Sequence, residues 1–273
     1  MMKVDLDKCI GCGLCSKDCI VHDIKIVQCR ANMKNRACVK CGHCIAICPK
    51  KAVSTNDYDA TEIKEFNKED FYIESENLLN FIKFRRSIRN FKNKEVEIEK
   101  INKIIETGRF TQTGGNTQNV SYIIVKDKLQ ELRELALESL NQKGAEILSN
   151  PNIKDKQARK YAPMWIKMYD EFKQNPNGED KLFFKAPVII LVTSDSEVNG
   201  ALASSNMELM TNTLGLGTIF SGFLVRASQG NEKISNFLGL NPNDKIITCM
   251  VIGYPNTKYF RTVPRKEADI SWL

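Results

Sequence analysis

Eight cysteines near the N-terminus fall into two segments with the same spacing. The pattern Cys-x-x-Cys-x-x-Cys-x-x-x-Cys is formed by Cys9, Cys12, Cys15 and Cys19, and again by Cys38, Cys41, Cys44 and Cys48. Thiolates ligate the irons of a cubane cluster, and three closely spaced cysteines can hold three corners while the fourth points toward a second cubane. The predicted ligands of two 4Fe–4S clusters are therefore Cys9, Cys12, Cys15 and Cys48 for one, and Cys38, Cys41, Cys44 and Cys19 for the other.

A pair of zinc sites is the alternative interpretation of these cysteines. Structural zinc sites more often use two separated Cys-x-x-Cys pairs, so the cysteine triplets favour iron–sulfur clusters. Gly11, Gly13 and Gly42 lie between the cysteines, where they let the backbone approach a cluster and donate N–H groups to its sulfurs. Cys29 is left over between the two segments, and we expect it to be a buried thiol rather than a ligand.

Residues 1–60 resemble a bacterial-type ferredoxin with two 4Fe–4S clusters, because both complete motifs are present. The sequence departs from that pattern at Ile20, which stands where the first motif usually has proline. A module of this kind passes single electrons and has no substrate pocket of its own. The function of the chain must therefore depend on the part that the clusters serve.

The composition separates this segment from the rest of the chain. Of ten cysteines in 273 residues, only Cys249 lies beyond residue 48. The N-terminus lacks an apolar signal segment, and the apolar run 188–192 is far shorter than the roughly 20 residues that span a bilayer. We therefore expect a cytoplasmic protein that does not enter a membrane, in a reducing compartment that suits metal-binding cysteines. The net charge of +7 includes no dense basic stripe, which argues against nucleic acid as a partner.

Missing residue types narrow the chemistry of the second part. Both histidines, His22 and His43, lie in the cysteine-rich segment. Hydrolysis by a Ser-His-Asp triad, cysteine–histidine catalysis and histidine-ligated zinc are therefore excluded there. The segment Gly215-Leu-Gly217 begins like a dinucleotide-binding fingerprint, but Phe220 stands where the third glycine belongs. A Rossmann site is therefore not expected.

Two polar segments of the second part could bind an anion or a heterocycle. Residues 85–91 contain three arginines and a serine, and arginine forks form charge-assisted, bidentate bonds to phosphate. Residues 113–119 combine two glycines with the amides of Asn116 and Gln118, which can both donate and accept hydrogen bonds. Taken singly, the first could equally be a solvated face and the second a polar turn before a strand.

These segments occur with four others in the order seen in the nitroreductase family of FMN enzymes. The six segments are 85–91, 114–118, 185–187, 214–217, 253–255 and 264–266. The resemblance covers residues 81–273, so the whole chain resembles a ferredoxin–nitroreductase fusion. It implies an α+β fold in which a small ferredoxin-like domain (1–60) and a linker (61–80) precede an FMN-binding sandwich (81–273). The sandwich is expected to have a central, mostly antiparallel sheet flanked by helices.

The resemblance also implies which residues bind FMN. The FMN phosphate and the flavin pyrimidine edge would be held by Arg85, Arg86, Ser87 and Arg89, and the phosphate also by Arg265 and Lys266. The ribityl chain or the ring would contact Asn116 and Gln118. The N5 side of the flavin would face Ser221 and Gly222. The family forms homodimers with FMN at the subunit interface, so these residues would come from two chains. No side chain is assigned as a catalytic acid, because the chemistry centres on the flavin.

The expected reaction is electron transfer to a small planar acceptor such as a nitroaromatic or a quinone. Electrons would come from NAD(P)H, from a redox protein through the clusters, or from both. Three alternatives on the same scaffold are dehalogenation, enone reduction and flavin reduction. A non-enzymatic redox relay or sensor is a fourth alternative.

Hydrophobic periodicity indicates the elements that position these residues. Helices are predicted from Ser75, over 98–108, 128–149 and 155–173, and near 201–214. Strands are predicted at 120–126, 188–193 and 246–252. Tyr161 and Trp165 have helical spacing, and we expect such aromatic residues to lie in the core or a dimer interface rather than to contact substrate.

Overall fold

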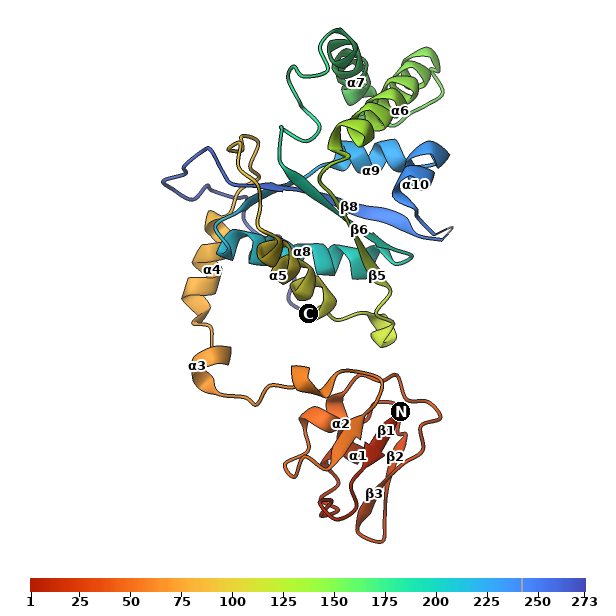
Figure 1. Ribbon diagram of the computed structural model, residues 1–273, viewed down its shortest axis with the longest axis vertical. Coiled ribbons are helices and arrows are strands. Elements are labelled where there is room, and N and C mark those ends of the chain that lie inside the picture. The colour runs from red at the N-terminus through yellow and green to blue at the C-terminus, as the bar shows by residue number, and fades with distance from the viewer. Residues whose placement is uncertain (242) are drawn as a thin grey trace. The chain divides into compact units, whose positions relative to one another are not determined.

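The computed structural model describes residues 1–241 and 243–273. The chain divides into two compact units (Figure 1). The first unit contains Met1–Glu74 together with Thr113–Thr117, and the second contains Ser75–Gln112 and Gln118–Leu273. The domain boundaries at residues 60 and 80 stay a prediction.

The first unit is built from two short antiparallel strand pairs and several single-turn helices. Its elements are β1 (Met2–Val4), α1 (Leu14–Asp18), β2 (Ile24–Val27), β3 (Arg30–Met33), α2 (His43–Ala46), β4 (Val53–Thr55), η1 (Ala60–Glu62), α3 (Lys68–Phe71) and η2 (Gly114–Asn116). Strand β1 pairs with β4, and β2 pairs with β3. Gly13 and Gly42 precede α1 and α2 with φ of 79° and 77°, a conformation that glycine adopts without steric cost.

The hydrophobic core of the first unit is small. Only Cys15, Ile24 and Ala31 form its buried cluster, with a few half-buried neighbours packed against them. A core of this size contributes little stability, and small natural folds usually add disulfides or metals. We therefore expect bound cofactors to contribute to the stability of this unit.

A four-stranded sheet forms the centre of the second unit. Its strands are β5 (Val120–Val125), β6 (Val188–Ser194), β7 (Gly217–Phe220) and β8 (Lys245–Gly253), in the order β5-β6-β8-β7. All three pairings are antiparallel. Every residue of β6 is buried, which explains why this strand is a continuous apolar run rather than an alternating one.

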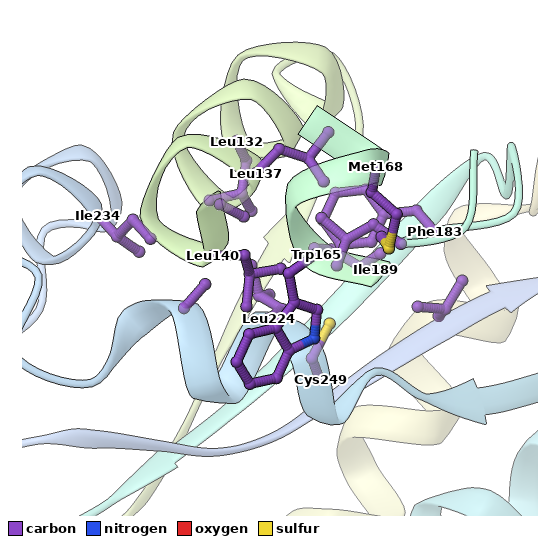
Figure 2. Close-up of a cluster of buried hydrophobic side chains, with 14 of the residues drawn as sticks. Leu132, Leu137, Leu140, Trp165, Met168, Phe183, Ile189, Leu224, Ile234 and Cys249 are labelled. Carbon is purple, nitrogen blue, oxygen red and sulfur yellow. The ribbon is translucent and has the colours of Figure 1, made fainter. Parts of the chain in front are cut away.

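Helices cover both faces of this sheet (Figure 1). They are α5 (Ile98–Arg109), α6 (Leu129–Ser149), α7 (Lys156–Gln174), α8 (Glu197–Thr213), α9 (Gly222–Ser228) and α10 (Glu232–Leu238). Helix α4 (Ser75–Phe84) has no buried residue and is not part of these layers. Ile189 and Leu191 of β6 pack with α6, α7, α9 and α10, and Figure 2 shows part of this cluster. Val188, Ile190 and Val192 point to the other face, where they pack with α5 and α8. The alternation of β-strand side chains thus divides the core into two layers.

The predicted α+β fold with a mostly antiparallel sheet between helices is confirmed. The predicted strands correspond to β5, β6 and β8, and the predicted helices correspond to α4 to α8. Helix α8 begins at Glu197, four residues before the predicted start, because Ser196 caps it by accepting the N–H of Asn199. Strand β7 and helices α9 and α10 were not predicted. Among the described residues, no helix combines the length and the hydropathy required to cross a membrane.

Candidate functional site

Two small cavities in the first unit are each surrounded by four cysteines. Cys9, Cys12, Cys15 and Cys48 line one of them, which we call the first cysteine cavity. Cys19, Cys38, Cys41 and Cys44 line the other, the second cysteine cavity. The structure thus brings together each predicted ligand set, with the last cysteine of each motif crossing to the other group. Ligation itself stays a prediction.

Burial changes the pKa of two thiols at the cysteine cavities. The pKa of Cys44 is raised to about 11, chiefly by burial and to a smaller extent by the neighbouring thiols of Cys38 and Cys41. The pKa of Cys15 is also raised, chiefly by burial. Coordination to a metal deprotonates a thiol outright, and four thiols around one cavity are the number that a cubane cluster requires. The donor set therefore fits iron–sulfur clusters.

Cys29 differs from the sequence expectation. Its side chain is exposed rather than buried, and it is not among the described residues that line either cysteine cavity. The reason is its position at the tip of the β2–β3 hairpin, with φ of 57°. The carbonyl of Cys29 lies against the backbone of Gly11, so closely that a Cβ on Gly11 would overlap with it. Gly11 is therefore required for this close approach.

A larger cavity of about 520 Å³ lies in the second unit. Its walls come from α7, α9, the turn before β6 and the end of β7. Three predicted FMN-binding residues line it, namely Arg89, Ser221 and Gly222. Arg89 has no ion-pair partner among the described residues, so its guanidinium is available to a ligand.

The segment before Arg89 runs beside β7, and this contact brings Arg89 to the cavity. Ser87 forms a parallel bridge with Thr218, and the N–H of Ile88 donates to the carbonyl of Thr218 at 3.0 Å. Beyond β7, the N–H of Ser221 donates to the carbonyl of Cys249 at 2.8 Å. The two segments therefore deliver Arg89 and Ser221 to the same cavity from distant parts of the sequence.

Gly217 is the residue that allows this close packing. A Cβ placed on Gly217 would overlap with the side chain of Ile88. We expect Gly217→Ala to lower the free energy of unfolding by about 1–3 kcal/mol, the usual cost of overpacking, and to displace Arg89. Chemical denaturation and flavin content after gel filtration measure the two effects. For the unfolding measurement alone, Gly222→Ala is the matched control, since a Cβ there meets no protein atom within 4 Å; equal losses of stability in the two variants would contradict this account.

The two arginines before Ser87 differ in their partners. Arg85 Nη1 lies 2.9 Å from Oε1 of Glu208, a carboxylate that is only 8% exposed. Burial raises the pKa of Glu208, while the charge of Arg85 opposes that shift. In Arg86, the buried Nε and Nη2 have no hydrogen-bond partner among the described residues. Because an unsatisfied buried donor is costly, an anion such as a phosphate fits this position.

The other predicted FMN-binding residues are not among the described residues that line the large cavity. Asn116 belongs to the first unit, where its Nδ2 donates to the carbonyl of Val39 at 2.9 Å. Gln118 opens the second stretch of the second unit, with φ of 49°. Arg265 and Lys266 lie in an exposed terminal segment without regular structure. Their roles in binding FMN stay predictions.

Aromatic residues of α7 form a wall of the large cavity, a role that the sequence did not indicate. Tyr161 and Trp165 both line it, and their rings lie 5.4 Å and 5.8 Å from the ring of Phe223 in edge-to-face geometry. Trp165 is also part of the hydrophobic core, as expected. The i,i+4 spacing placed the two side chains on one face of a helix, but it did not show what that face contacts.

A buried ion pair shapes another wall of this cavity. Nε of Arg133 lies 3.2 Å from Oδ1 of Asp180, and both side chains are less than 10% exposed. The carboxylate of Asp180 also accepts the N–H groups of Leu182, Phe183 and Lys185, at 2.9–3.1 Å. This turn presents Lys181 and Phe184 to the cavity.

The backbone of the same turn is strained. Phe184 and Lys185 have φ of 56° and 53°, values that residues with a Cβ adopt only at a cost. Burial lowers the pKa of Arg133, while the charge of Asp180 opposes that shift. The Arg133–Asp180 pair and its hydrogen bonds therefore hold the cavity wall in a conformation that the turn would not adopt alone.

Comparison with protein families assigns both parts of the chain. Residues 82–254 match the family described as "Nitroreductase family", and residues 1–49 match the family described as "4Fe-4S dicluster domain". The predicted fusion of a ferredoxin-type domain with a nitroreductase domain is confirmed by these two matches.

Curated relatives match each part separately. Iodotyrosine deiodinase from Hydra vulgaris is 26% identical over 189 residues, which cover 63% of this chain and 62% of that protein. A component of an ion-translocating oxidoreductase complex from Methanosarcina acetivorans is 42% identical over 45 residues, which cover 16% of this chain and 17% of that protein. The chain therefore covers less than two thirds of either relative.

A solved structure supports the fold of the second unit. The nitroreductase with bound FMN from Bacteroides fragilis has a TM-score of 0.54 to this chain and 20% sequence identity. The superposition covers 72% of this chain and 98% of that protein. At this identity the likeness concerns the fold alone.

Proposed function

The chain belongs to the nitroreductase family, and we propose that it is an iron–sulfur flavoprotein oxidoreductase that reduces a small planar acceptor. The observation that carries this proposal is the large cavity, where Arg89, Ser221 and Gly222 come together in a chain that also has two four-cysteine cavities. FMN would supply hydride and single-electron chemistry when bound. The chain itself would supply binding, orientation and charge.

Side chains on the segment 85–89 would bind the FMN phosphate and ring. The unpartnered nitrogens of Arg86 support a phosphate contact, because guanidinium forks bind phosphate with two parallel hydrogen bonds. Arg85 would donate to FMN from the guanidinium nitrogens that do not contact Glu208. Ser87 would contribute its hydroxyl. Arg89 would face the pyrimidine edge, since it lines the cavity beside Ser221 and Gly222.

We propose that the protein works as a homodimer. Helix α4 has no buried residue, and its side chains Leu78, Leu79 and Ile82 are exposed instead of packed in the core. The terminal segment exposes Phe260 and Trp272, the latter at 92%. Exposed apolar surface of this extent is typical of interfaces, and two-fold dimers are the commonest oligomers. Asn116, Gln118, Arg265 and Lys266 would then complete FMN sites shared between two copies.

The acceptor would be planar and aromatic, such as a nitroaromatic or a quinone. The edge-to-face rings of Tyr161, Trp165 and Phe223 form an apolar wall that suits a flat molecule. NAD(P)H would deliver electrons directly, and a redox protein would deliver them through the first unit.

Anaerobic purification followed by quantification of iron, sulfide and flavin per chain tests the proposal. Two clusters and one FMN correspond to about eight irons and one flavin. The flavin absorbance should then bleach with NADH, NADPH or reduced ferredoxin, and recover on addition of a nitroaromatic or a quinone. Bound cofactors without turnover of any small acceptor would indicate the redox relay or sensor instead.

Reductive dehalogenation is a second candidate function, favoured by the 26% identity to an iodotyrosine deiodinase. Incubation of the reduced protein with 3-iodotyrosine, followed by measurement of released iodide, tests this reaction. Iodide release that exceeds nitroaromatic reduction would favour dehalogenation. Activity with enones or free flavin would indicate the other reactions considered for this scaffold.

Arg85→Ala is expected to reduce the flavin retained after gel filtration by roughly tenfold, since a charged hydrogen bond contributes about 1.5–3 kcal/mol. The substitution also leaves the Glu208 carboxylate buried without its cation. The double variant Arg85→Ala/Glu208→Gln removes that carboxylate charge and is therefore the matched control. Flavin loss in both variants supports a direct contact between Arg85 and FMN. Recovery of flavin in the double variant would show that Arg85 acts only by neutralising Glu208.

A further inference from the structure

The two cysteine cavities have the same ligand spacing but different charged linings. Asp23, which is only 6% exposed, lines the second cysteine cavity. Lys50 lines the first cysteine cavity, whose described lining contains no carboxylate. The described lining of the second cavity contains no lysine or arginine. A charge of opposite sign therefore accompanies each cavity.

The carboxylate of Asp23 is held in place by the backbone that leads to Cys38. It accepts the N–H of Arg36 at 3.1 Å and 3.2 Å on its two oxygens, and the N–H of Ala37 at 3.2 Å. The N–H of Lys34 donates to the backbone carbonyl of Asp23. A fixed, buried carboxylate acts strongly on its neighbours, because little water screens it.

Backbone hydrogen bonds to sulfur add to the difference in electrostatic environment between the two cysteine cavities. At the first cysteine cavity, the N–H of Ala31 lies 3.4 Å from Cys9 Sγ, and that of Ala52 lies 3.3 Å from Cys48 Sγ. Net charge and hydrogen bonds to the sulfurs both set the reduction potential of an iron–sulfur cluster. Donated hydrogen bonds and a nearby cation favour the reduced form, which is more negative. A nearby carboxylate disfavours it.

We infer that Asp23, with a smaller contribution from the exposed Lys50, gives the two clusters unequal reduction potentials, with the cluster at the second cysteine cavity as the stronger reductant. This inference rests on the two clusters of the proposed function. It goes further by assigning a direction to electron flow within the first unit. One electron leaves the cluster at the second cavity, which is oxidised, and reduces the cluster at the first cavity, with no bond or proton transferred. The donor that reduces the cluster at the second cysteine cavity again would be a one-electron redox protein.

The remaining ionisable side chain at the second cavity does not cancel the effect of Asp23. His43 Nδ1 lies 3.1 Å from the carboxylate of Asp18, and both side chains are at least 40% exposed. Any positive charge on this ring is matched by Asp18, and solvent screens both groups. Asp23 is buried, so its charge dominates.

A redox titration of the full chain, followed by electron paramagnetic resonance, measures this asymmetry. The wild-type protein should show two one-electron midpoints. Asp23→Asn keeps an amide oxygen for the N–H donors and removes the charge, so it should raise the lower midpoint and narrow the gap. Lys50→Gln should lower the upper midpoint potential and so also decrease the difference between the two midpoints. We expect Asp23→Asn to change the electron distribution between the two clusters by roughly tenfold, which for a one-electron couple is about 59 mV. Lys50→Gln should have a smaller effect, because Lys50 is exposed and solvent screens its charge.

Lys51→Gln is the matched control, because the Nζ of Lys51 pairs with Glu65 and the side chain is not among the described residues at either cavity. The gap should stay unchanged in this variant. If Asp23→Asn loses iron, the comparison of Lys50→Gln with Lys51→Gln carries the test. The inference is overturned if the wild-type protein with full iron shows a single midpoint for both clusters. It is also overturned if the difference between the two midpoints widens in either variant. Both outcomes leave the proposed function standing. Absence of cluster signals would instead refute the proposed function.

Discussion

Cys9→Ala and Cys38→Ala are each expected to remove about half of the iron and to slow ferredoxin-driven reduction of acceptors by roughly 100-fold, while FMN stays bound. Each substitution leaves one corner of one cluster without a thiolate, and the two cysteines line different cavities. Turnover with NAD(P)H should persist, because that donor can act directly on the flavin. The expected result is therefore a loss specific to one electron donor.

Iron, sulfide and flavin per chain, together with rates for each donor, measure this prediction. Cys29→Ala is the matched control, since Cys29 is an exposed cysteine outside both cavities. Because the core of the first unit is small, loss of one cluster can unfold this unit, and the second cluster is then lost as well. In that case iron falls to near zero, yet flavin content and NAD(P)H-driven rates should remain. Wild-type rates with every donor would refute the electron relay.

Much of the architecture could be predicted because it depends on local pattern. The apolar run of β6 indicated a strand, and the helical periodicities gave α5, α6 and α7 to within a residue at each end. The cysteine motifs specified three members of each four-cysteine group, since those three share one short loop and helix, and the two-cluster pattern assigned the fourth. Patterns of this kind need no knowledge of distant residues.

The large cavity could be predicted only in part, because it depends on contacts between distant segments. Arg89 and Ser221 line the same cavity because the N–H of Ile88 donates to the carbonyl of Thr218, and Gly217 leaves room for the side chain of Ile88. No local pattern in the sequence indicates this pairing. Strand β7 has the sequence Gly-Thr-Ile-Phe, and its last three residues favour strands, but four residues are too few to show a clear alternation. Its prediction required knowledge of its partner β8.

Buried charges were the other feature that sequence reasoning missed. Arg133 lies on α6, where an arginine is ordinarily a solvated side chain. It is buried here because Asp180 supplies the opposite charge from the turn before β6, far along the chain. Asp23 was overlooked for the same reason, since its backbone partners lie on the next loop. Burial of an ionisable group depends on its partner, and a single sequence does not show that partner.

Asp180→Ala is expected to lower the free energy of unfolding of the second unit by roughly 3–5 kcal/mol, because it leaves Arg133 as a buried charge without a partner. It also removes the acceptor for three backbone N–H groups of a strained turn. For a domain of this size the loss corresponds to a fall in Tm of about 6–20 °C. Thermal and urea unfolding of the full chain, followed by far-ultraviolet circular dichroism, measure it.

The exposed pair of Glu134 on α6 and Lys173 on α7 provides the matched control. Its N–O distance of 3.4 Å is close to that of the buried pair, but its side chains are 52% and 54% exposed. Glu134→Ala should therefore change stability by less than about 1 kcal/mol. Asp180→Asn separates charge from hydrogen bonding, since its amide oxygen can still accept N–H groups of the turn. If Asp180→Ala costs no more than Glu134→Ala, the buried pair does not hold the cavity wall, and the strained turn must be stabilised by the packing of Leu182 and Phe183 alone.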